Sequence, residues 1–157
     1  MAKEDAVKSG LGGWLILVGL GVIISPLYSL MAINEYLPIF QENLIEELVS
    51  INPFWEYYIW TEIIVNLIIF LCSVYAVFLF FTKKTFFPKF YICLLCGISA
   101  FMVLDTVVGE MLLQEIDYEE QYTDSESRME TGKALLSTII WVPYLLFSKR
   151  VKATFVK

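Results

Sequence analysis

Histidine is absent from this chain of 157 residues, and lysine and arginine contribute only 11 residues against 17 aspartates and glutamates. Histidine is the commonest general acid or base and the commonest imidazole ligand of metals, so its absence argues against most hydrolases and metalloenzymes. Nucleic acid is bound by clustered cations, and a net charge of −6 leaves no basic face for it. We therefore expect no catalytic residues, no metal, no cofactor and no nucleic-acid partner.

Cysteine is scarce as well, with only Cys72, Cys93 and Cys96 in the chain. The segment CLLC, Cys93 to Cys96, has the C-x-x-C spacing of redox and metal sites, but no second pair accompanies it and its neighbours are apolar. Packing among apolar side chains is the expected role of all three thiols.

Apolar residues, by contrast, are abundant. They make up 58% of the chain, the mean hydropathy is +0.67, and charged residues reach only 18%, against about 25% in soluble domains. Four apolar segments stand out, at about 12–33, 58–81, 90–113 and 131–147. Three of them reach the length of about 20 residues that a helix needs to cross a bilayer, and the fourth is short. Since lipid supplies no hydrogen-bond partner to a bare backbone, each span is expected to be a helix.

The distribution of cations predicts how the chain crosses the membrane. Lysine and arginine concentrate in cytoplasmic loops, and nine of the eleven cations precede the first segment, separate the second from the third, or follow the fourth. Only Arg128 and Lys133 fall on the other side, which carries most of the acids. We therefore predict a single domain over residues 1–157, an all-α integral membrane protein that forms a four-transmembrane-helix bundle with both termini cytoplasmic.

A short amphipathic helix is expected between the first two segments, in PIFQENLIEELVSI, residues 38–51. Its apolar and acidic side chains fall on opposite faces of a helix. The apolar face contains Phe40, Leu44, Leu48 and Ile51, and the acidic face contains Glu42, Glu46 and Glu47. We place this helix at the outer membrane interface, where it either caps the bundle or forms a lid over a ligand site.

The first apolar segment begins with GLGGWLILVGLGVIISP, residues 10–26. Its glycines fit neither the phosphate-loop nor the dinucleotide-binding spacing, and the run is longer than the apolar part of a cleavable signal peptide. A retained span is the better interpretation. Small residues on one stripe of that span allow close approach of another helix, namely Gly13, Gly21, Ser25 and Ser29.

Ionisable and amide side chains inside the predicted spans are the strongest candidates for a functional site. Glu62 and Asn66 lie four residues apart on one face of the second span, and Asp105 lies in the third. Since these two spans are antiparallel, all three residues fall in the outer half of the membrane, with Ser25 and Tyr28 of the first span at similar depth. We predict that these five side chains form an intramembrane polar cluster.

Two interpretations of that cluster remain open. A buried carboxylate is costly in lipid, so it normally pairs, takes up a proton or lines a wet cavity. The cluster therefore either fixes the register of the helices through hydrogen bonds or binds an ion or a small molecule. An intramembrane aspartyl protease would need two aspartates, and the predicted spans contain only Asp105.

The segment SKRVKATF, residues 148–155, is basic and follows the fourth span directly. Lys149, Arg150 and Lys152 are placed to contact anionic lipid headgroups, and Phe155 is expected to dip back into the interface. The same residues offer an alternative docking site for a cytosolic partner.

Five blocks of the sequence are distinctive: GLGGWLILVGLGVIISP, TEIIVNL, FFTKKTFFPKFYI, VLDTVVG and IWVPYLLFSKRVKATF. In these blocks the chain resembles, over nearly its whole length, the bacterial four-span membrane proteins of the domain-of-unknown-function family twenty-five sixty-nine. The resemblance implies a bacterial cytoplasmic (inner) membrane location and supplies no activity. It also implies matching positions at Glu62, Asn66, Pro88, Asp105, Trp141, Pro143, Tyr144, Arg150 and Phe155.

From these observations we expect a non-enzymatic membrane protein that serves as an accessory or structural component. The alternative is a binding or permeation module that admits a small molecule, a cation or a proton to the outer polar cluster. The expected partners are the lipid bilayer and either another membrane protein or a second copy of the chain.

Overall fold

Helices make up nearly all of the part of the chain that the structure describes. The computed structural model describes residues 10–41, 44–114 and 121–157, and no strand occurs within these ranges. The predicted all-α class is therefore confirmed. The helices, in chain order, are α1 (Leu15–Glu35), α2 (Leu37–Gln41), α3 (Leu44–Ile51), α4 (Phe54–Phe81), α5 (Phe87–Leu113), α6 (Gln121–Phe147) and α7 (Lys149–Thr154).

Among the described residues, three stretches of helix are long and apolar enough to cross a bilayer: Leu15–Phe40, Phe54–Phe81 and Phe87–Leu113. They coincide with the first three predicted spans and agree with a multi-pass membrane protein. The fourth predicted span, 131–147, lies in the second half of α6. That helix is 27 residues long, but its first half is polar, so its crossing of the membrane stays a prediction.

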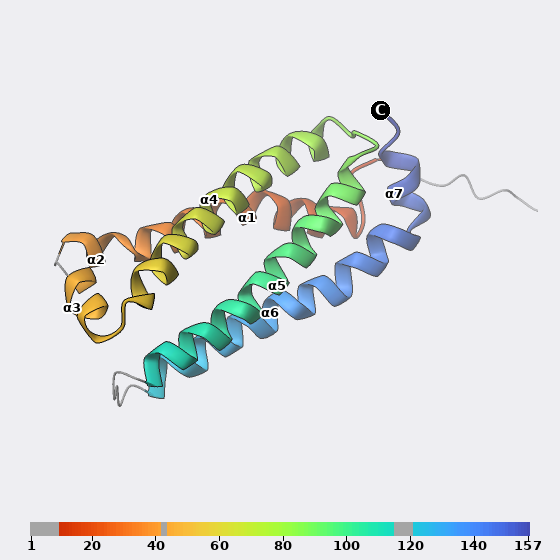
Figure 1. The fold of residues 1–157 in the computed structure, drawn as a ribbon. Coiled ribbons are helices and arrows are strands. Elements are labelled where there is room, and N and C mark those ends of the chain that lie inside the picture. The colour runs from red at the N-terminus through yellow and green to blue at the C-terminus, as the bar shows by residue number, and fades with distance from the viewer. Residues whose placement is uncertain (1–9, 42–43, 115–120) are drawn as a thin grey trace, which may run out of the picture.

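The four long helices form two pairs (Figure 1). α1 packs along α4, and α5 packs along α6, while α4 and α5 are neighbours joined by a short connection. The two pairs lie close together near that connection and spread apart toward α2 and α3. We name the end that holds the α4–α5 connection and α7 the α7 end, and the opposite end the α3 end.

Small residues set how closely α1 approaches α4. Gly19 faces the Phe80 ring so tightly that a Cβ at Gly19 would lie 2.9 Å from a ring carbon. Further along the pair, the Ser25 and Ser73 hydroxyls share a hydrogen bond of 2.8 Å. Close approach through small side chains is a usual way in which membrane helices pack.

Hydroxyl groups hold α6 to α5. The Ser99 and Thr138 hydroxyls are 2.7 Å apart, and the Thr106 and Thr131 hydroxyls are also 2.7 Å apart. Ser99 lies 3.2 Å from the Ala134 carbonyl as well, and can donate to it. Because these polar groups bond each other across the two helices, α6 packs against α5 despite its shorter apolar run.

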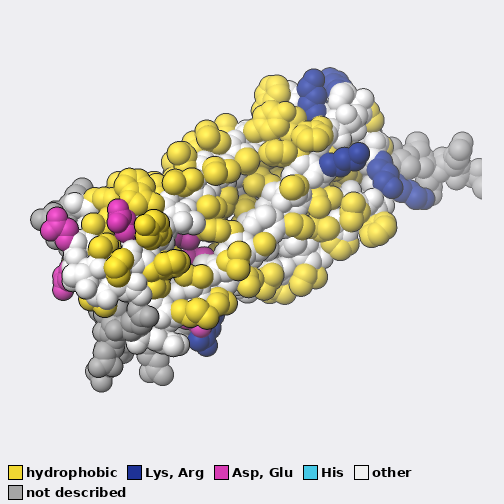
Figure 2. Space-filling model, viewed as in Figure 1, with side chains coloured by type: hydrophobic (Ala, Val, Ile, Leu, Met, Phe, Trp, Pro, Cys, Tyr) yellow, Lys and Arg dark blue, Asp and Glu magenta, His cyan; other side chains and the backbone are white. Residues whose placement is uncertain are grey.

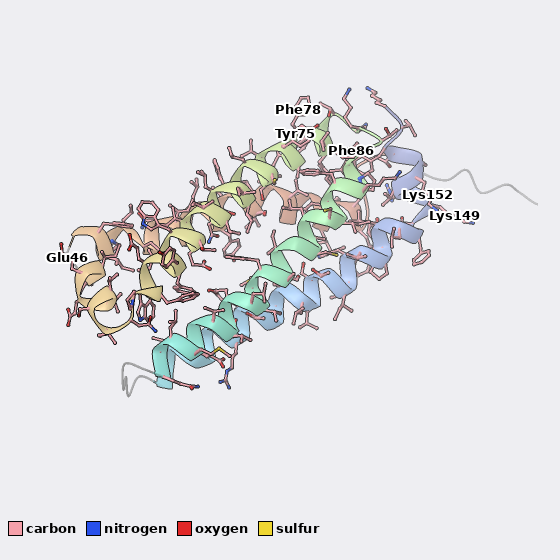
Figure 3. The ribbon with its side chains drawn as sticks, viewed as in Figure 1. Glu46, Tyr75, Phe78, Phe86, Lys149 and Lys152 are labelled. Atoms are coloured by element: carbon pink, nitrogen blue, oxygen red, sulfur yellow. The ribbon has the colours of Figure 1, made fainter. Side chains whose placement is uncertain are left out.

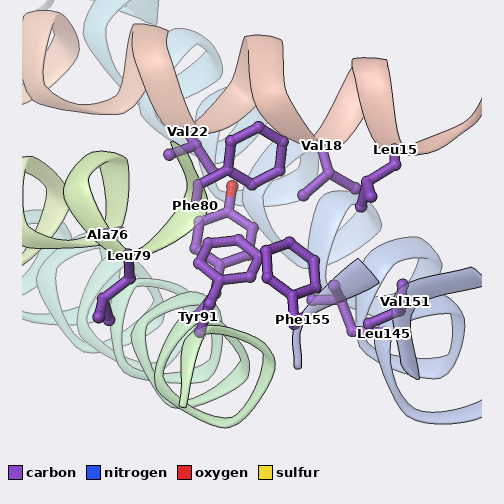
Figure 4. Packing of buried hydrophobic residues seen from close by; sticks show 11 residues of the cluster. Leu15, Val18, Val22, Ala76, Leu79, Phe80, Tyr91, Leu145, Val151 and Phe155 are labelled. Carbon is purple, nitrogen blue, oxygen red and sulfur yellow. The ribbon is translucent and has the colours of Figure 1, made fainter. Parts of the chain in front are cut away.

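The hydrophobic core lies at the α7 end, where the two helix pairs meet (Figure 4). Phe87 is completely buried there, with its ring centroid 4.6 Å from that of Phe155 and 5.2 Å from that of Phe80. All four long helices and the C-terminal segment contribute side chains. The core consists of Leu15, Val18, Val22, Ala76, Leu79, Phe80, Phe87, Tyr91, Leu145, Val151 and Phe155.

The C-terminal segment folds into this core, which corrects the prediction for Phe155. Its ring does not dip into the membrane interface; it is only 5% exposed and stacks on Phe87. The Ser148 hydroxyl caps the start of α7 by accepting a hydrogen bond from the Val151 amide at 3.4 Å. Val151 and Phe155 lie four residues apart on one helical face, so both point inward.

Hydrogen bonds tie the end of the described chain to two other segments. The Thr85 amide donates to the Lys157 carbonyl at 2.7 Å, and the Lys157 amide donates to the Lys83 carbonyl at 3.2 Å. The Thr154 hydroxyl accepts from the Gly10 amide at 3.0 Å. The turn before α1, the α4–α5 connection and α7 are therefore joined at one end of the molecule.

The described residues between α1 and α4 are largely helical, and residues 42–43 of the predicted helix 38–51 lie outside the described part of the chain. α2 and α3 are separate helices, and α3 packs against α4. Leu44 and Leu48 are half-buried and Glu46 and Glu47 are exposed, as predicted, but Phe40 and Ile51 of the predicted apolar face are 39% and 47% exposed. The predicted division into two faces is therefore present only in part. Glu42 lies outside the described residues, and the placement of α3 at a membrane interface stays a prediction.

Charged side chains separate along the length of the molecule (Figure 2). Most of the visible Lys and Arg lie at the α7 end, most of the visible Asp and Glu lie toward the α3 end, and hydrophobic side chains cover much of the surface between. Lys3 and Lys8, which the topology prediction counted, lie outside the described residues. The separation places the basic residues beside α7 and the α4–α5 connection.

Phe155→Ala should destabilise the folded protein by about 3–5 kcal/mol, the usual cost of removing a buried phenyl ring. Val156→Ala is the matched control, because Val156 is 65% exposed and its truncation should change little. Thermal unfolding in a mild detergent, followed by tryptophan fluorescence, measures both variants. Equal melting temperatures for the two would contradict the inward placement of Phe155.

Candidate functional site: a carboxyl pair between two helices

Glu62 is the only charged side chain that is buried in the described part of the chain, with 5% of it exposed. It lies in the first half of α4, toward the α3 end and several turns from the hydrophobic core. A carboxyl group at such a position in an apolar helix needs polar partners. The residues around Glu62 supply them.

Two neutral donors surround Glu62. The Asn66 amide nitrogen donates to the Glu62 carboxylate at 3.2 Å and to the Glu62 backbone carbonyl at 3.0 Å. Tyr36, which directly follows α1, reaches the same carboxylate with its hydroxyl. The contact made by Tyr36 connects the end of α1 to α4, in a part of the molecule that has few fully buried apolar side chains.

Asp105 meets Glu62 from α5. The two carboxyl groups lie within hydrogen-bonding reach of each other, and the Tyr58 hydroxyl donates to Asp105 Oδ1 at 2.6 Å. Gly109, one turn beyond Asp105, leaves room for this bond, because a Cβ at Gly109 would lie 3.1 Å from the Tyr58 hydroxyl oxygen. The carboxyl pair therefore links the two helix pairs where they begin to spread apart.

The structure brings together three of the five side chains of the predicted cluster: Glu62, Asn66 and Asp105. Ser25 instead bonds Ser73, which lies about 16 Å from Glu62 along α4 at about 1.5 Å per residue. Tyr28 is 67% exposed on the surface of α1. The sequence prediction grouped these residues by their expected depth in the membrane. In the structure, Ser25 lies too far from Glu62 along the α1–α4 pair, and Tyr28 points away from α4.

Sequence reasoning missed the two tyrosines of this site. Tyr58 precedes Glu62 by four residues, so helical periodicity places both on one face of α4 and offered a usable signal. Tyr36 follows the end of α1, and no periodicity in the sequence connects it to Glu62. Only the packing of α1 on α4 brings its hydroxyl to the carboxylate.

A buried donor lies one turn before Tyr58. The Trp55 indole N–H is buried and has no hydrogen-bond partner among the described residues, and the Trp55 ring meets the Tyr58 ring edge to face at 5.7 Å. Buried indole N–H groups usually find an acceptor. This donor would therefore be stabilised by water or by another acceptor that enters beside Tyr58.

The donor set of the site consists of hard oxygen ligands. It offers two carboxyl groups, two phenol oxygens and one amide, which suit protons and hard cations better than soft transition metals. Within the described ranges, no group of three or more Cys, Asp or Glu side chains forms a metal site. The arrangement can therefore exchange a proton or hold a small cation between the two carboxyl groups.

The predicted headgroup contacts lie at the opposite end of the molecule. Figure 3 shows Lys149 and Lys152 at the α7 end, far from Glu46 at the α3 end. Both lysines are exposed, whereas Arg150 is half-buried and donates from Nε to the Gly10 carbonyl at 3.3 Å. Contact between these cations and lipid headgroups stays a prediction.

Comparison with known proteins adds a family but no activity. A family model described as "Protein of unknown function (DUF2569)" matches residues 8–156. No curated protein and no solved structure matches the chain.

Asp105→Leu should lower the stability of the fold by about 1–2 kcal/mol, because it leaves Tyr58 and Glu62 without a partner, and hydrogen bonds between membrane helices contribute about 0.6–1.7 kcal/mol each. Asp105→Asn keeps the shape and an acceptor, so it should lose much less. Leu104→Ala is the control, since Leu104 is 64% exposed on the same turn. Thermal unfolding in detergent ranks the three variants, and an Asp105→Leu variant as stable as the native protein would contradict the contact.

Proposed function

The chain belongs to the DUF2569 family of proteins of unknown function, whose model covers nearly all of it, and we propose that it binds a proton or a small cation inside a membrane. The observation that carries this proposal is the contact between the Glu62 and Asp105 carboxyl groups. We propose further that the protein is a non-enzymatic, four-span protein of the bacterial cytoplasmic membrane with both termini in the cytoplasm.

The carboxyl pair needs a positive charge that none of the described residues supplies. Two carboxyl groups in contact repel each other when both are ionised, so one of them keeps a proton unless a cation binds between them. The sequence contains no Lys or Arg from residue 10 to residue 81, and Lys89 lies several turns from Asp105 at the start of α5. Arg128 of α6 bonds Glu110 at 2.7 Å, and Lys133 is exposed. A proton or cation from solution therefore completes the site.

Neutral donors around the pair support exchange of that charge. Tyr58 donates to Asp105 and Asn66 donates to Glu62, so each carboxylate keeps one stabilising hydrogen bond when the proton or cation leaves. Lone buried carboxylates lack such support and are costly to ionise. The site is thus built to hold its carboxyl groups in place in both the loaded and the empty state.

The contacts at the α7 end support four membrane crossings. Gly10 precedes α1 and is hydrogen-bonded to Thr154 after α6, so both residues lie on one side of any membrane that the helices cross. An odd number of crossings between them would put them on opposite sides. Three apolar helices lie between these residues, and α6 is the remaining helix long enough to cross. The gathering of Lys and Arg at this end favours the cytoplasmic side.

An accessory or structural role was the first expectation from the sequence, and the geometry favours it less. A purely structural pair would serve equally well as a neutral hydrogen bond, for example between an amide and a hydroxyl. Two carboxyl groups instead introduce a charge that must be compensated. The absence of histidine from the chain and of an activated nucleophile from the site supports a non-enzymatic role.

The topology can be tested by labelling single cysteines in a variant without the three native ones. Glu46→Cys and Glu130→Cys should react with a membrane-impermeant maleimide added to intact cells, whereas Lys84→Cys and Lys157→Cys should react only after permeabilisation. All four positions are exposed in the structure, so accessibility within the fold is matched. Labelling of position 157 from outside would contradict both the cytoplasmic termini and the four spans.

The site should make stability depend on pH and on cations. If the native state binds a proton that the unfolded state lacks, the free energy of unfolding falls as pH rises from 5 to 8, and a cation that replaces the proton restores it at pH 8. A ligand at about 100 times its Kd contributes about 2.7 kcal/mol. Melting temperatures of protein in nanodiscs, measured with sodium, potassium, magnesium or calcium, follow both effects.

Glu62→Gln and Asp105→Asn should each abolish these responses, because either change removes one charge of the pair. Glu56→Gln is the control, an exposed carboxylate on the same helix whose loss should leave the response intact. If the native protein and both site variants respond identically to pH and to every cation, the binding proposal fails. An accessory role, with Glu62 and Asp105 as packing groups, would then be the better account.

A further inference from the structure

At the α7 end, a tight turn that contains three glycines precedes α1. The side chain of Arg150, which is distant in the sequence, lies against this turn. Gly10 and Gly13 have positive φ angles of 118° and 61°, a conformation that favours glycine, and the Gly12 amide donates to the Gly10 carbonyl at 2.9 Å. The turn leads directly into Trp14, which is 67% exposed, and then into the apolar surface of α1. It therefore lies where the first membrane-spanning helix begins.

Arg150 lies across this turn. Its Nε donates to the Gly10 carbonyl, while its two terminal nitrogens lie over Gly12 and Gly13. A Cβ at Gly12 would be 2.6 Å from Nη2, and a Cβ at Gly13 would be 2.8 Å from Nη1. The absence of side chains at Gly12 and Gly13 thus determines where the guanidinium group rests. Among the described residues, only Nε of this group has an acceptor.

α7 holds the arginine in this position and exposes two lysines beside it. Val151 and Phe155 are buried in the core, and the Thr154 hydroxyl bonds Gly10, so the helix cannot rotate freely. Lys149 and Lys152 flank Arg150 in the sequence and are both exposed. The result is a cationic surface of three side chains, one of them fixed against a backbone turn.

We infer that this surface, formed by Arg150, Lys149 and Lys152 over the turn at residues 10–13, binds the phosphate group of an anionic lipid headgroup. A guanidinium fork whose terminal N–H groups have no acceptor among the described residues matches two phosphate oxygens, and lysines add positive charge with less demand on geometry. The adjacent exposed Trp14 and the apolar face of α1 place this charge beside the acyl chains of the lipid. The inference is independent of the carboxyl pair, which lies at the far end of the helices.

A specific headgroup site differs from the diffuse attraction of any basic loop, and Gly12 makes the difference testable. Gly12→Ala leaves the charge unchanged but moves the guanidinium group, because the added methyl would overlap the end of this flexible side chain. Lys89→Gln is the matched control, since it removes one exposed charge at the start of α5 without touching the turn. If the attraction were diffuse, Lys89→Gln would weaken lipid binding more than Gly12→Ala.

The experiment measures phosphatidylglycerol binding to the full chain by native mass spectrometry from detergent, with phosphatidylcholine as the zwitterionic reference. We expect the native protein and Lys89→Gln to retain one phosphatidylglycerol in preference to phosphatidylcholine. Gly12→Ala, Arg150→Gln and the double variant Lys149→Gln/Lys152→Gln should bind it at least about tenfold more weakly, the scale of lost hydrogen bonds to a charged group. Melting temperatures without lipid check that each variant is folded.

Three results would overturn the inference. Equal phosphatidylglycerol binding by the native protein, Gly12→Ala and the double lysine variant would show that no site exists at this turn, even if Arg150→Gln fails to fold. A loss in Lys89→Gln as large as that in Gly12→Ala would show diffuse attraction. Displacement of the lipid by millimolar inorganic phosphate or glycerol phosphate would identify a soluble phosphate as the ligand.

Discussion

Hydrocarbon offers no hydrogen-bond partner, and within the long helices the buried and half-buried hydroxyl and carboxyl side chains bond to one another across helix pairs or to neighbouring polar groups. The hydroxyl pairs Ser99–Thr138 and Thr106–Thr131 satisfy each other between α5 and α6, and Ser25 and Ser73 do the same between α1 and α4. Because association of helices in lipid has little hydrophobic driving force, these bonds and close packing at Gly19 hold the pairs together. Hydrogen bonds between polar side chains therefore connect the two helices of each pair.

The closely packed part of the two helix pairs and their polar site lie at different places along the helices. At the α7 end, aromatic rings from α4, α5 and the C-terminal segment stack closely around Phe87. Toward the α3 end, the same helices spread apart, and Glu62 and Asp105 form the link between them. A packed end provides a fixed base, so that small changes at the polar end can occur without loss of the fold. This division suits a site whose occupancy changes.

The sequence predicted the helices well because apolar length and charge placement are local properties. Predicted spans at 12–33, 58–81 and 90–113 lie within a few residues of α1, α4 and α5. The meeting of Glu62 with Asp105 was also accessible, since both depths can be counted from the helix ends. Tyr36 and Phe155 were not, because each acts through a turn of the chain at a helix end, where helical periodicity stops. The inward course of α7 depends on Ser148 and on the ring of Phe87 that receives Phe155.

The bond between Gly10 and Thr154 joins residues 144 positions apart, which gives the molecule an order of assembly. During synthesis, α1 can pair with α4 before α5 has formed, and α5 can pair with α6 afterwards. The turn before α1 and the rings of Phe80 and Phe87 reach their final, buried packing only after α7 and Phe155 have been made. A chain in which α7 failed to dock would leave the Phe80 and Phe87 rings without their contact to Phe155, and the glycine turn without its bonds to Arg150 and Thr154.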